Sequence, residues 1–592
     1  MKKFLSGNEA VARGAYEAGV KLAVGYPGTP STEILETVAE EYRSIYSQWS
    51  PNEKVAFEVG IGASLGGARA LVTMKHVGLN VAADPFMTFA YTGVNGGFVV
   101  ISADDPEMHS SQNEQDNRFF AKFAQIPFLE PSDSQEAKDF VLKAFEISEK
   151  FDTPVMLRMT TRVSHSKGIV EENEPVVLPE GSFKRDMQKY VMIPSNAKKR
   201  HVVVTERLDK LREYSEKTEL NKEENNGSKI GIITGGIAYQ YVKEVIPDAD
   251  YFKIGFGFPL PIDKIRKFVD AHQINLVIEE LEPYYEEILK AAGIKVEGKK
   301  YFSRLGELSP YRVSLGMKEA GIINEAYSAE IEPEQLFPRP PILCPGCPHR
   351  GAFMALKKLG VAVTGDIGCY TLAVLPPLEI MDSCICMGAS IGNAIGMEKV
   401  KGHKKGVVAV IGDSTFLHSG ITGLLDAVYN RSNVTVVILD NRITAMTGGQ
   451  QHPSTGYTLM GEPTKSVNFI ELAKALGVES VREVDPYDYK KLLEVFKEEI
   501  EREGPSVVIT NRPCVLMPKR IMDKPHRVIL EDCNGCSACF RIGCPAILPS
   551  KELTKRNRPK AEIDPTLCTG CSLCAQVCQP EAIVLVEEPV VR

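Results

Sequence analysis

Two short apolar runs on either side of a helix-like segment decide the fold of this chain. The first run reads Val407-Val-Ala-Val-Ile-Gly-Asp413, and the second reads Val434-Thr-Val-Val-Ile-Leu-Asp-Asn441. Both runs are rich in β-branched residues, which predicts buried strands, and Ser419 to Tyr429 between them has helical apolar spacing. Strand, helix and strand in this order predict a right-handed parallel crossover. Asp413 and Asn441 then lie side by side at the carboxyl edge of a sheet.

This sheet edge is where open α/β folds bind their ligands. A carboxylate and an amide oxygen there suit a hard cation such as Mg²⁺, which a few protein ligands hold together with ligand phosphates. The alternative is an ordinary crossover whose Asp and Asn lie in turns, where both residues are common. The stretch alone favours neither interpretation, so the rest of the chain has to decide.

The length and composition of the chain restrict its class. A chain of 592 residues predicts roughly three to five domains. The net charge of −8 argues against nucleic acid as a partner, and no apolar run approaches the length of a membrane span. Polar residues follow Met1-Lys-Lys-Phe-Leu5 at once, so we expect no secretory signal. The fourteen cysteines begin at Cys344, which favours metal ligation in a reducing, cytoplasmic compartment over a disulfide framework.

The cysteine-rich tail carries the most specific motif. It contains two runs, Cys533, Cys536, Cys539 and Cys544, then Cys568, Cys571, Cys574 and Cys578. Two such runs are the pattern of bacterial two-cluster ferredoxins, in which the fourth Cys of each run ligates the other cluster. The pattern predicts one 4Fe-4S cluster on Cys533, Cys536, Cys539 and Cys578, and another on Cys568, Cys571, Cys574 and Cys544. Zinc is the alternative, but eight cysteines in two near-repeats disfavour it. The first run has one residue more than usual before its last Cys, which distorts a loop without removing a ligand.

The amino-terminal part of the chain carries further candidates. Tyr26-Pro-Gly-Thr-Pro-Ser-Thr-Glu33 is a loop that leads into a helix. Glu58 has mostly apolar neighbours ahead of a Gly/Ala-rich helix, so we expect it to be buried with a raised pKa. Arg118 ends a polar loop and is the residue there best suited to bind an anion. Lys75 and His76 could face a substrate, although a Lys and a His in a loop are more often solvated.

These motifs together resemble the 2-oxoacid:ferredoxin oxidoreductases, a family that uses thiamine diphosphate. Gly7-Asn-Glu-Ala10, the Tyr26–Glu33 loop and Glu58 resemble its pyrimidine-binding domain. The Gly-Asp pair and the Asn of the opening stretch resemble the metal-binding motif of thiamine enzymes, and Thr447-Gly-Gly-Gln450 continues that resemblance. The chain departs from the motif at two positions, where Ser414 replaces a Gly and Asp440 replaces an Asn.

The resemblance implies a role for each candidate. Asp413, Asn441 and the carbonyl of Ile443 would hold the Mg²⁺ that grips the diphosphate, beside Gly412 and Ser414. Glu58 would contact the aminopyrimidine. Thr29 would contact the substrate carboxylate or the cofactor, or else serve only in a turn. Four other cysteines fall where related enzymes ligate a third cluster, namely Cys344, Cys347, Cys369 and Cys514. Buried free cysteines are the alternative for these four, and we predict that Cys384 and Cys386 are core residues.

The predicted fold class is α/β, with several parallel-sheet domains and a small C-terminal two-cluster ferredoxin-like α+β domain. The expected domains are a pyrimidine-binding domain at 1–180, a linker region at 181–228, a structural transketolase-like domain at 229–335, a diphosphate-binding domain at 336–520 and the ferredoxin-like domain at 521–592. A proline-rich break, Pro338-Arg-Pro-Pro341, precedes the fourth of these.

The resemblance implies oxidative decarboxylation of a 2-oxoacid, with transfer of the acyl group to coenzyme A and of electrons through the clusters to ferredoxin. The domain order resembles large subunits of the indolepyruvate type, which implies an aryl 2-oxoacid substrate. It also implies a smaller beta subunit that supplies a missing γ-type domain, in an α₂β₂ assembly. Two alternatives stay open. One is the same chemistry on pyruvate or branched-chain 2-oxoacids, and the other is an electron-transfer subunit whose thiamine site is vestigial.

Overall fold

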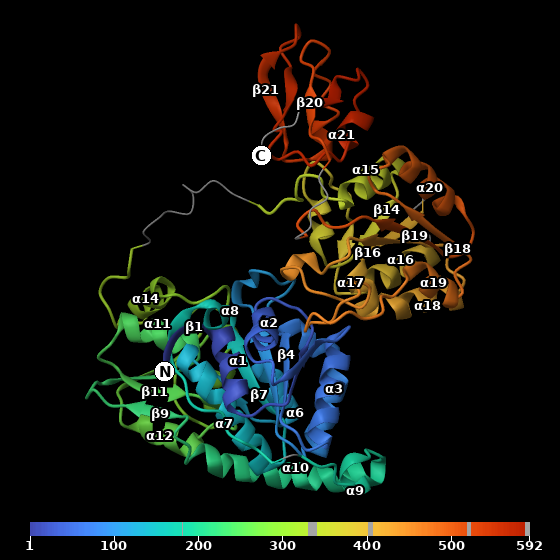
Figure 1. Ribbon diagram of the computed structural model, residues 1–592. Coiled ribbons are helices and arrows are strands. Elements are labelled where there is room, and N and C mark those ends of the chain that lie inside the picture. The colour runs from blue at the N-terminus through green and yellow to red at the C-terminus, as the bar shows by residue number, and fades with distance from the viewer. Residues whose placement is uncertain (180, 329–339, 401–405, 518–522, 587–592) are drawn as a thin grey trace. The chain divides into compact units, whose positions relative to one another are not determined.

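The computed structural model describes residues 1–179, 181–328, 340–400, 406–517 and 523–586 (Figure 1). The chain divides into two compact units, Met1–Leu336 and Phe337–Arg592. The predicted domain boundaries at 335 and 520 and the first half of the proline-rich break lie outside the described residues. Within the described ranges, no helix has both the length and the apolar character that a membrane crossing requires.

A seven-stranded sheet organises the first unit, in the order β12-β6-β7-β5-β4-β2-β3. Its strands are β2 (Leu22–Gly25), β3 (Tyr46–Trp49), β4 (Ala70–Lys75), β5 (Phe98–Asp104), β6 (Phe128–Leu129), β7 (Val155–Thr160) and β12 (Phe256–Phe258). Every neighbouring pair is parallel except β12 with β6. The parallel strands are joined by α2 (Thr32–Glu41), α3 (Glu53–Leu65), α4 (His76–Val81), α5 (Ala83–Thr92), α6 (Arg118–Ala124) and α7 (Ser134–Phe151).

Helix α3 packs closely on this sheet because glycine leaves room at the contact. A Cβ atom at Gly60 would lie 2.5 Å from Cγ2 of Val72 and 2.9 Å from Cε2 of Phe98. The neighbouring Phe57 ring is fully buried among the same strands. Close packing against the sheet therefore accounts for this glycine. Two more helices, α1 (Gly7–Glu17) and α8 (Thr161–His165), and the antiparallel pair β1 (Lys2–Ser6) and β8 (Lys167–Glu171) complete this part of the unit.

A second sheet in the same unit has the order β13-β10-β11-β9. Its strands are β9 (Lys222–Glu224), β10 (Ile230–Gly235), β11 (Asp250–Ile254) and β13 (Ile274–Ile278), and its helices are α11 (Ile237–Val245), α12 (Ile262–Asp270), α13 (Tyr284–Ala291) and α14 (Pro310–Glu319). The two sheets are not independent, because β12 follows β11 in the chain but pairs with β6 of the first sheet.

We predicted a linker at residues 181–228, but the structure shows regular elements in this segment. It contains the short helix α9 (Met187–Tyr190), the 22-residue helix α10 (Pro194–Ser215) and strand β9. Helix α10 is anchored by Arg207, whose guanidinium donates to the carbonyls of Ala90 and Asp152. The segment is rich in charged residues, a composition that is typical of a solvated link. One side of α10 is nevertheless held against the helices of the first sheet.

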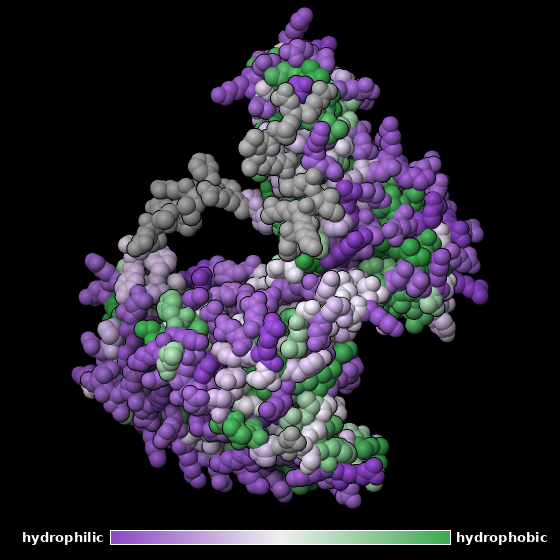
Figure 2. Space-filling model, in the orientation of Figure 1, coloured by the Kyte–Doolittle hydropathy of each residue, from purple (hydrophilic) through white to green (hydrophobic). Residues whose placement is uncertain are grey.

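A six-stranded, fully parallel sheet organises the second unit, in the order β15-β14-β16-β17-β19-β18. Its strands are β14 (Ala362–Gly365), β15 (Ser383–Cys384), β16 (Val407–Gly412), β17 (Thr435–Asp440), β18 (Ser480–Val484) and β19 (Ser506–Asn511). Its longer helices are α15 (His349–Leu359), α16 (Ala389–Lys399), α18 (Ile421–Tyr429), α19 (Phe469–Ala475) and α20 (Tyr489–Glu501). Figure 2 shows hydrophobic residues at the surface over these helices, where Leu425 of α18 is 49% exposed.

The cysteine-rich tail belongs to the second unit. It consists of two antiparallel pairs, β20 (His526–Val528) with β23 (Ile583–Leu585) and β21 (Ile547–Leu553) with β22 (Pro559–Ile563), and the single-turn helix α21 (Leu573–Gln576). The tail and the six-stranded sheet share one hydrophobic cluster, in which Leu573 of the tail and Leu492 of α20 are both buried. The side chain of Gln576 also bonds to the backbone of Tyr487 and Tyr489.

Candidate functional site

The opening stretch forms the predicted crossover in the second unit. Strands β16 and β17 are parallel neighbours with Gly412 opposite Leu439, so Asp413 and Asn441 follow adjacent strands at one edge. Within the sheet, β15 lies on one side of β14, and β16, β17 and β19 lie on the other side. The edge between β14 and β16 is therefore the point where the strand order reverses, which is the ligand-binding position of open α/β sheets. A π-helical turn, Phe416–Gly420, follows Asp413, and such turns are frequent at functional sites.

Asp413 has the surroundings of a cation ligand. Its carboxylate is almost fully buried and accepts hydrogen bonds from the backbone N–H groups of Ser414 (2.7 Å) and Arg442 (2.8 Å). The ion partner recorded for it within the described ranges is His452, whose Nε2 lies 3.3 Å from Oδ2. A buried carboxylate without a lysine or arginine ion pair fits a metal ion and an anionic ligand.

Asn441 and its neighbours complete the edge. Oδ1 of Asn441 accepts from the N–H of Ile443 at 3.3 Å, and Nδ2 lies 3.4 Å from Nε2 of His349. Burial lowers the pKa of His349 to about 4, so this imidazole is neutral near pH 7. Burial, and then the nearby carboxylate of Asp413, raises the pKa of Asp440 to about 7. Asp413 and Asn441 thus lie at the same edge, and the carboxyl groups of Asp413 and Asp440 repel each other in a way that a nearby cation would relieve.

The two departures from the thiamine motif are accommodated locally. The hydroxyl of Ser414 accepts a hydrogen bond from Thr444 (3.1 Å), and the N–H of Gly412 donates to the hydroxyl of Tyr370 (2.9 Å). Oδ1 of Asp440, the other departure, accepts a hydrogen bond from the N–H of Arg442 at 3.1 Å. Sequence reasoning missed His349 and His452. Their signal was their position beside motifs already recognised, directly after Cys-Pro-Gly-Cys-Pro and after Thr-Gly-Gly-Gln-Gln.

The four cysteines of the predicted third cluster gather beside this edge. Burial raises the pKa of Cys347 to about 12 and that of Cys369 to about 11, and neighbouring thiols of the same group add to both shifts. Burial also raises the pKa of Cys514, and the nearby Cys344 and Asp413 raise it further. The N–H of Cys514 donates to the carbonyl of Asn441 at 3.0 Å, which ties the fourth cysteine to the metal-binding loop. Four thiols from three separate segments therefore converge next to Asp413.

The eight tail cysteines form two pockets. One pocket is lined by Cys533, Cys536, Cys539 and Cys578. The other is lined by Cys544, Cys568, Cys571 and Cys574. Each pocket thus combines three thiols of one run with the last thiol of the other run, which is the crossed arrangement predicted from the spacing. The four thiols of each pocket suit an iron–sulfur cluster.

The first unit has its own polar edge, between β2 and β4, where its strand order also reverses. Burial lowers the pKa of Lys75 to about 8, against the opposing charges of Asp105 and Glu53. Nζ of Lys75 donates to the carbonyl of Ser110 (3.0 Å), and the hydroxyl of Ser110 donates to the carbonyl of Thr29 (3.3 Å). Thr29 is half-buried at this edge. Lys75 is not the solvated loop residue that was the alternative, because it ends a strand of the sheet interior.

The expectation of a buried Glu58 is wrong for this chain. Glu58 lies on the outer face of α3, its side chain is 44% exposed, and it forms an ion pair with Lys54. Glu53, five residues earlier on the same helix, is only 5% exposed and its carboxylate packs against Gly78 of α4. Helix α3 is apolar on most sides, so its sequence did not reveal which side faces the sheet. Glu53, which sequence reasoning missed, has the burial that was predicted for Glu58.

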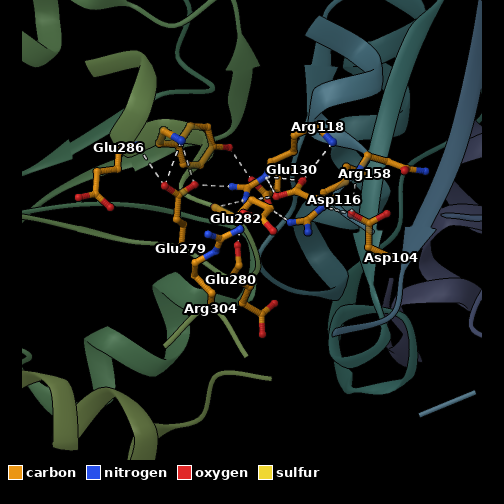
Figure 3. Close-up of polar contacts among 12 residues, drawn as sticks. Asp104, Asp116, Arg118, Glu130, Arg158, Glu279, Glu280, Glu282, Glu286 and Arg304 are labelled. Atoms are coloured by element: carbon orange, nitrogen blue, oxygen red, sulfur yellow. Dashed lines mark hydrogen bonds and ion pairs between the residues drawn. The ribbon is translucent and has the colours of Figure 1, made fainter. Parts of the chain in front are cut away.

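The prediction that Arg118 binds a substrate anion is also wrong. Its side chain is fully engaged inside the first unit, as Figure 3 shows. The guanidinium pairs with Asp116 and with Glu279 (2.7 Å) and lies over the rings of Tyr284 and Tyr285. Because Glu279 follows β13, Arg118 joins the two sheets of the unit, and its guanidinium is occupied by these buried partners.

Cys384 and Cys386 were predicted to be core residues, and this is wrong for Cys386, which is exposed. Cys384 is half-buried, and its thiol donates to the carbonyl of Asp366 at 3.6 Å. Cys384 ends the short strand β15, and Cys386 follows it. This strand lies at the border of the sheet, where burial is incomplete.

Family models match three parts of the chain. Residues 13–229 match the thiamine-diphosphate-binding region of pyruvate flavodoxin/ferredoxin oxidoreductases. Residues 366–510 match the C-terminal binding domain of thiamine pyrophosphate enzymes, and residues 561–584 match a 4Fe-4S binding domain. The three matches contain, in turn, the Lys75 edge, the Asp413 edge and the second cysteine run.

Close relatives match nearly the whole chain. The indolepyruvate oxidoreductase subunit IorA of Pyrococcus abyssi is 45% identical over 99% of this chain and 97% of its own length. The chain belongs to the IorA family. The IorA subunit of Archaeoglobus fulgidus is 41% identical over 98% of this chain and 97% of its own length. A solved 2-oxoglutarate:ferredoxin oxidoreductase from Magnetococcus marinus is 15% identical to this chain, with a TM-score of 0.46. The match covers 54% of this chain and 65% of the solved chain.

Membership in the IorA family establishes the general chemistry. The chain is part of a thiamine-diphosphate-dependent 2-oxoacid:ferredoxin oxidoreductase that oxidises a 2-oxoacid with iron–sulfur electron transfer. The α/β fold with a C-terminal 4Fe-4S domain, predicted from the sequence, is confirmed by these matches.

Proposed function

We propose that the chain is the large subunit of an enzyme that converts an aryl 2-oxoacid of the indolepyruvate type and coenzyme A to the aryl-acetyl-CoA and CO₂, with two electrons passed to ferredoxin. The observation that carries this proposal is the likeness to IorA subunits along nearly the full chain. It is supported by the position of the Asp413 edge beside four converging cysteines.

The residues of the second unit have the binding roles. Asp413, Asn441 and the carbonyl of Ile443 hold Mg²⁺, and through it the diphosphate, with Gly412 and Ser414 beside them. Thiamine diphosphate held there would supply the nucleophilic carbon and the electron sink that decarboxylation of a 2-oxoacid requires. His349 stays neutral and orients Asn441. Cys344, Cys347, Cys369 and Cys514 hold a third cluster where the electrons leave, and the tail pockets hold the other two.

The residues of the first unit have the proton-transfer roles. Glu53 replaces Glu58 as our candidate for the carboxyl group that exchanges a proton with the aminopyrimidine, because it is the buried one of the two. Lys75 offers a cation of lowered pKa at the same edge, and Thr29 lies in the loop next to it. These three residues are placed by the ends of neighbouring strands and so are held in fixed positions.

The substrate is tested by an anaerobic assay of the complete enzyme with indolepyruvate, phenylpyruvate, pyruvate and a branched-chain 2-oxoacid. Viologen reduction and thioester formation are followed, each with and without coenzyme A. We expect the highest kcat/KM for the aryl substrates and no thioester without coenzyme A. A higher kcat/KM for pyruvate or a branched-chain acid would replace the aryl assignment while leaving the chemistry in place.

The second candidate is an electron-transfer subunit with a vestigial thiamine site, motivated by Ser414 and Asp440. The local accommodation of Ser414 by Thr444 argues against it. The thiamine diphosphate content of anaerobically purified protein separates the two functions. We expect one cofactor for each chain, whereas a preparation with full iron content but no thiamine diphosphate would favour the second candidate.

The partner is a smaller beta subunit with the γ-type domain, in an α₂β₂ assembly. Light scattering of the co-expressed subunits tests the stoichiometry, and we expect the mass of two copies of each. The chain purified alone should bind its cofactors yet show little turnover, since part of the catalytic machinery is supplied by the beta subunit. Full turnover by the isolated chain would contradict this arrangement.

A further inference from the structure

Arg350 is a buried cation in the second unit, at the contact between α15 and the cysteine-rich tail. Only 2% of the residue is exposed. One guanidinium nitrogen donates to the carbonyls of Ile542 (2.9 Å) and Gly543 (2.7 Å) in the tail. The other nitrogens donate to the carbonyls of Leu343 and Cys344 in the loop before α15. Within the described ranges, all these recorded partners are backbone carbonyls and none is a carboxylate.

The position of Arg350 brings its charge to two groups of cysteines at once. Arg350 lines the tail pocket that also contains Cys544, Cys568, Cys571 and Cys574. Its guanidinium also donates to the carbonyl of Cys344, the first cysteine of the loop beside the Asp413 edge. One guanidinium therefore lies next to both groups of cysteines.

The two cysteine loops on either side of Arg350 are in direct contact. Gly346 lies between Cys344 and Cys347, and a Cβ atom there would fall 1.8 Å from Oγ1 of Thr569, which lies between Cys568 and Cys571. Its φ of +66° also favours glycine. Tyr487 reinforces the contact, since its hydroxyl donates to the carbonyl of Gly346. The backbone of one loop thus packs against a side chain of the other, and this contact holds Arg350 in a fixed position.

An arginine held only by carbonyl groups is unusual, because burying a cation without an anion is costly. Four thiolates around iron carry negative charge, and reduction adds one more negative charge to such a group. Net charge and hydrogen bonding are among the properties that set the reduction potentials of iron–sulfur clusters. A cation buried between two thiolate groups therefore makes both of them easier to reduce, with little screening by solvent.

We propose that Arg350 sets the reduction potentials of the two iron–sulfur groups that it separates, one on Cys344, Cys347, Cys369 and Cys514 and one on Cys544, Cys568, Cys571 and Cys574. This inference rests on the proposed function, which assigns clusters to those cysteines. One electron leaves the first group, which is oxidised, and enters the second, which is reduced, and ferredoxin is the final acceptor. No proton moves and no bond changes, since the guanidinium stays charged throughout. Arg350 is thus a positioning residue for electron transfer, and it does not line the pocket of Cys533, Cys536, Cys539 and Cys578.

The test is a redox titration of the complete enzyme, followed by electron paramagnetic resonance, for the native protein and the variants Arg350→Gln and Arg350→Lys. We expect Arg350→Gln to shift both neighbouring groups to more negative potentials by at least about tenfold in the reduction equilibrium, which is about 59 mV for one electron. The group on Cys533, Cys536, Cys539 and Cys578 should keep its potential. Arg350→Lys retains the charge and should restore most of the shift.

The matched control is Arg541→Gln, which removes an exposed arginine from the same tail. Solvent screens that charge, so we expect no shift. Unchanged potentials in Arg350→Gln together with a lower melting temperature would overturn the inference and leave Arg350 as a structural link. If Arg350→Gln loses iron, then Arg350→Lys decides: native potentials support the inference, and potentials shifted to the negative side, or loss of iron here too, overturn it.

The titration needs no substrate, so its result is separable from the proposed function. Iron analysis of the native enzyme shows whether the group on Cys344, Cys347, Cys369 and Cys514 is present. If that group is missing, the proposed third cluster fails, while the shift of the tail group still tests the effect of Arg350.

Discussion

The two parallel sheets carry different charges at the same topological position. In the first unit, the edge between β2 and β4 combines Lys75 with the carboxylates of Glu53 and Asp105. In the second unit, the edge between β14 and β16 has Asp413, whose recorded ion partner among the described residues is His452. Sheet topology thus determines where a ligand can bind, and the residues after each strand determine what is bound. One edge suits proton exchange, and the other suits a cation and its anionic ligand.

The largest expected effect comes from removing the anion of the second edge. Asp413→Ala should abolish binding of Mg²⁺ and thiamine diphosphate and reduce turnover by at least roughly a hundredfold, because metal sites depend strongly on their ligands. Thiamine and iron analyses measure this, and the tail iron should be unchanged. The control is Asp426→Ala on α18, an exposed position. Retention of the cofactor by Asp413→Ala would remove the assigned role of this edge.

The next largest effect tests the edge of the first unit. It decides whether Glu53 or Glu58 of α3 is the acid–base group. Glu53→Gln should retain the cofactor and reduce kcat by about 10²- to 10⁴-fold, as expected when a general acid–base group is lost. Glu58→Gln is the matched control on the same helix, with an expected change of less than about threefold. Steady-state kinetics of both variants decide between them. A large loss in Glu58→Gln alone would mean that Glu58 becomes buried in the assembled enzyme.

A third variant separates the edge of the first unit from the charges in its interior. Arg118→Met leaves the buried carboxylates of Asp116 and Glu279 without their partner, which costs about 3–5 kcal/mol in the free energy of unfolding. Calorimetry should show the lower melting temperature, with KM little changed. Arg304→Met removes an exposed arginine near the same network and should cost less than about 1 kcal/mol. A raised KM with normal stability in Arg118→Met would instead support the anion-binding role.

The smallest effect is a dependence of stability on pH at the first edge. The pKa of Lys75 is lowered from 10.5 to about 8, so between these values the unfolded chain binds more protons than the folded protein. The free energy of unfolding therefore rises with pH across that window, and the buried charge costs up to about 3 kcal/mol below pH 8.

Lys75→Met removes this charge. Its melting temperature should exceed that of the native protein at pH 7, and the difference should shrink as the pH rises from 8 towards 10.5. Lys199→Met, at an exposed position, serves as the control and should show no such trend. A difference that does not vary with pH would mean that Lys75 is not buried as a charged group.

Sequence reasoning was most successful where the chemistry depends on local spacing. The crossover of β16 and β17 followed from two β-branched runs, and the two tail pockets contain the cysteine sets that the spacing assigned. It was least successful where a side chain's surroundings come from distant segments. Arg118 looked like an anion binder in a polar loop, yet its partner Glu279 lies 161 residues further along the chain. Helix α10 was hidden because a charged composition obscured the few contacts that hold it.

What the sequence by itself determined is the set of candidate ligands, namely the spaced cysteines and Asp413 and Asn441 at strand ends, together with the fold class that aligns them. Ligand spacing and strand periodicity are local properties, so they can be read along the chain. What only the tertiary structure decided is which charges are buried. Glu53 and Glu58 are five residues apart on one helix, so they point roughly 140° away from each other. Since α3 is apolar on most sides, only its packing against the sheet separates the buried carboxyl group from the exposed one.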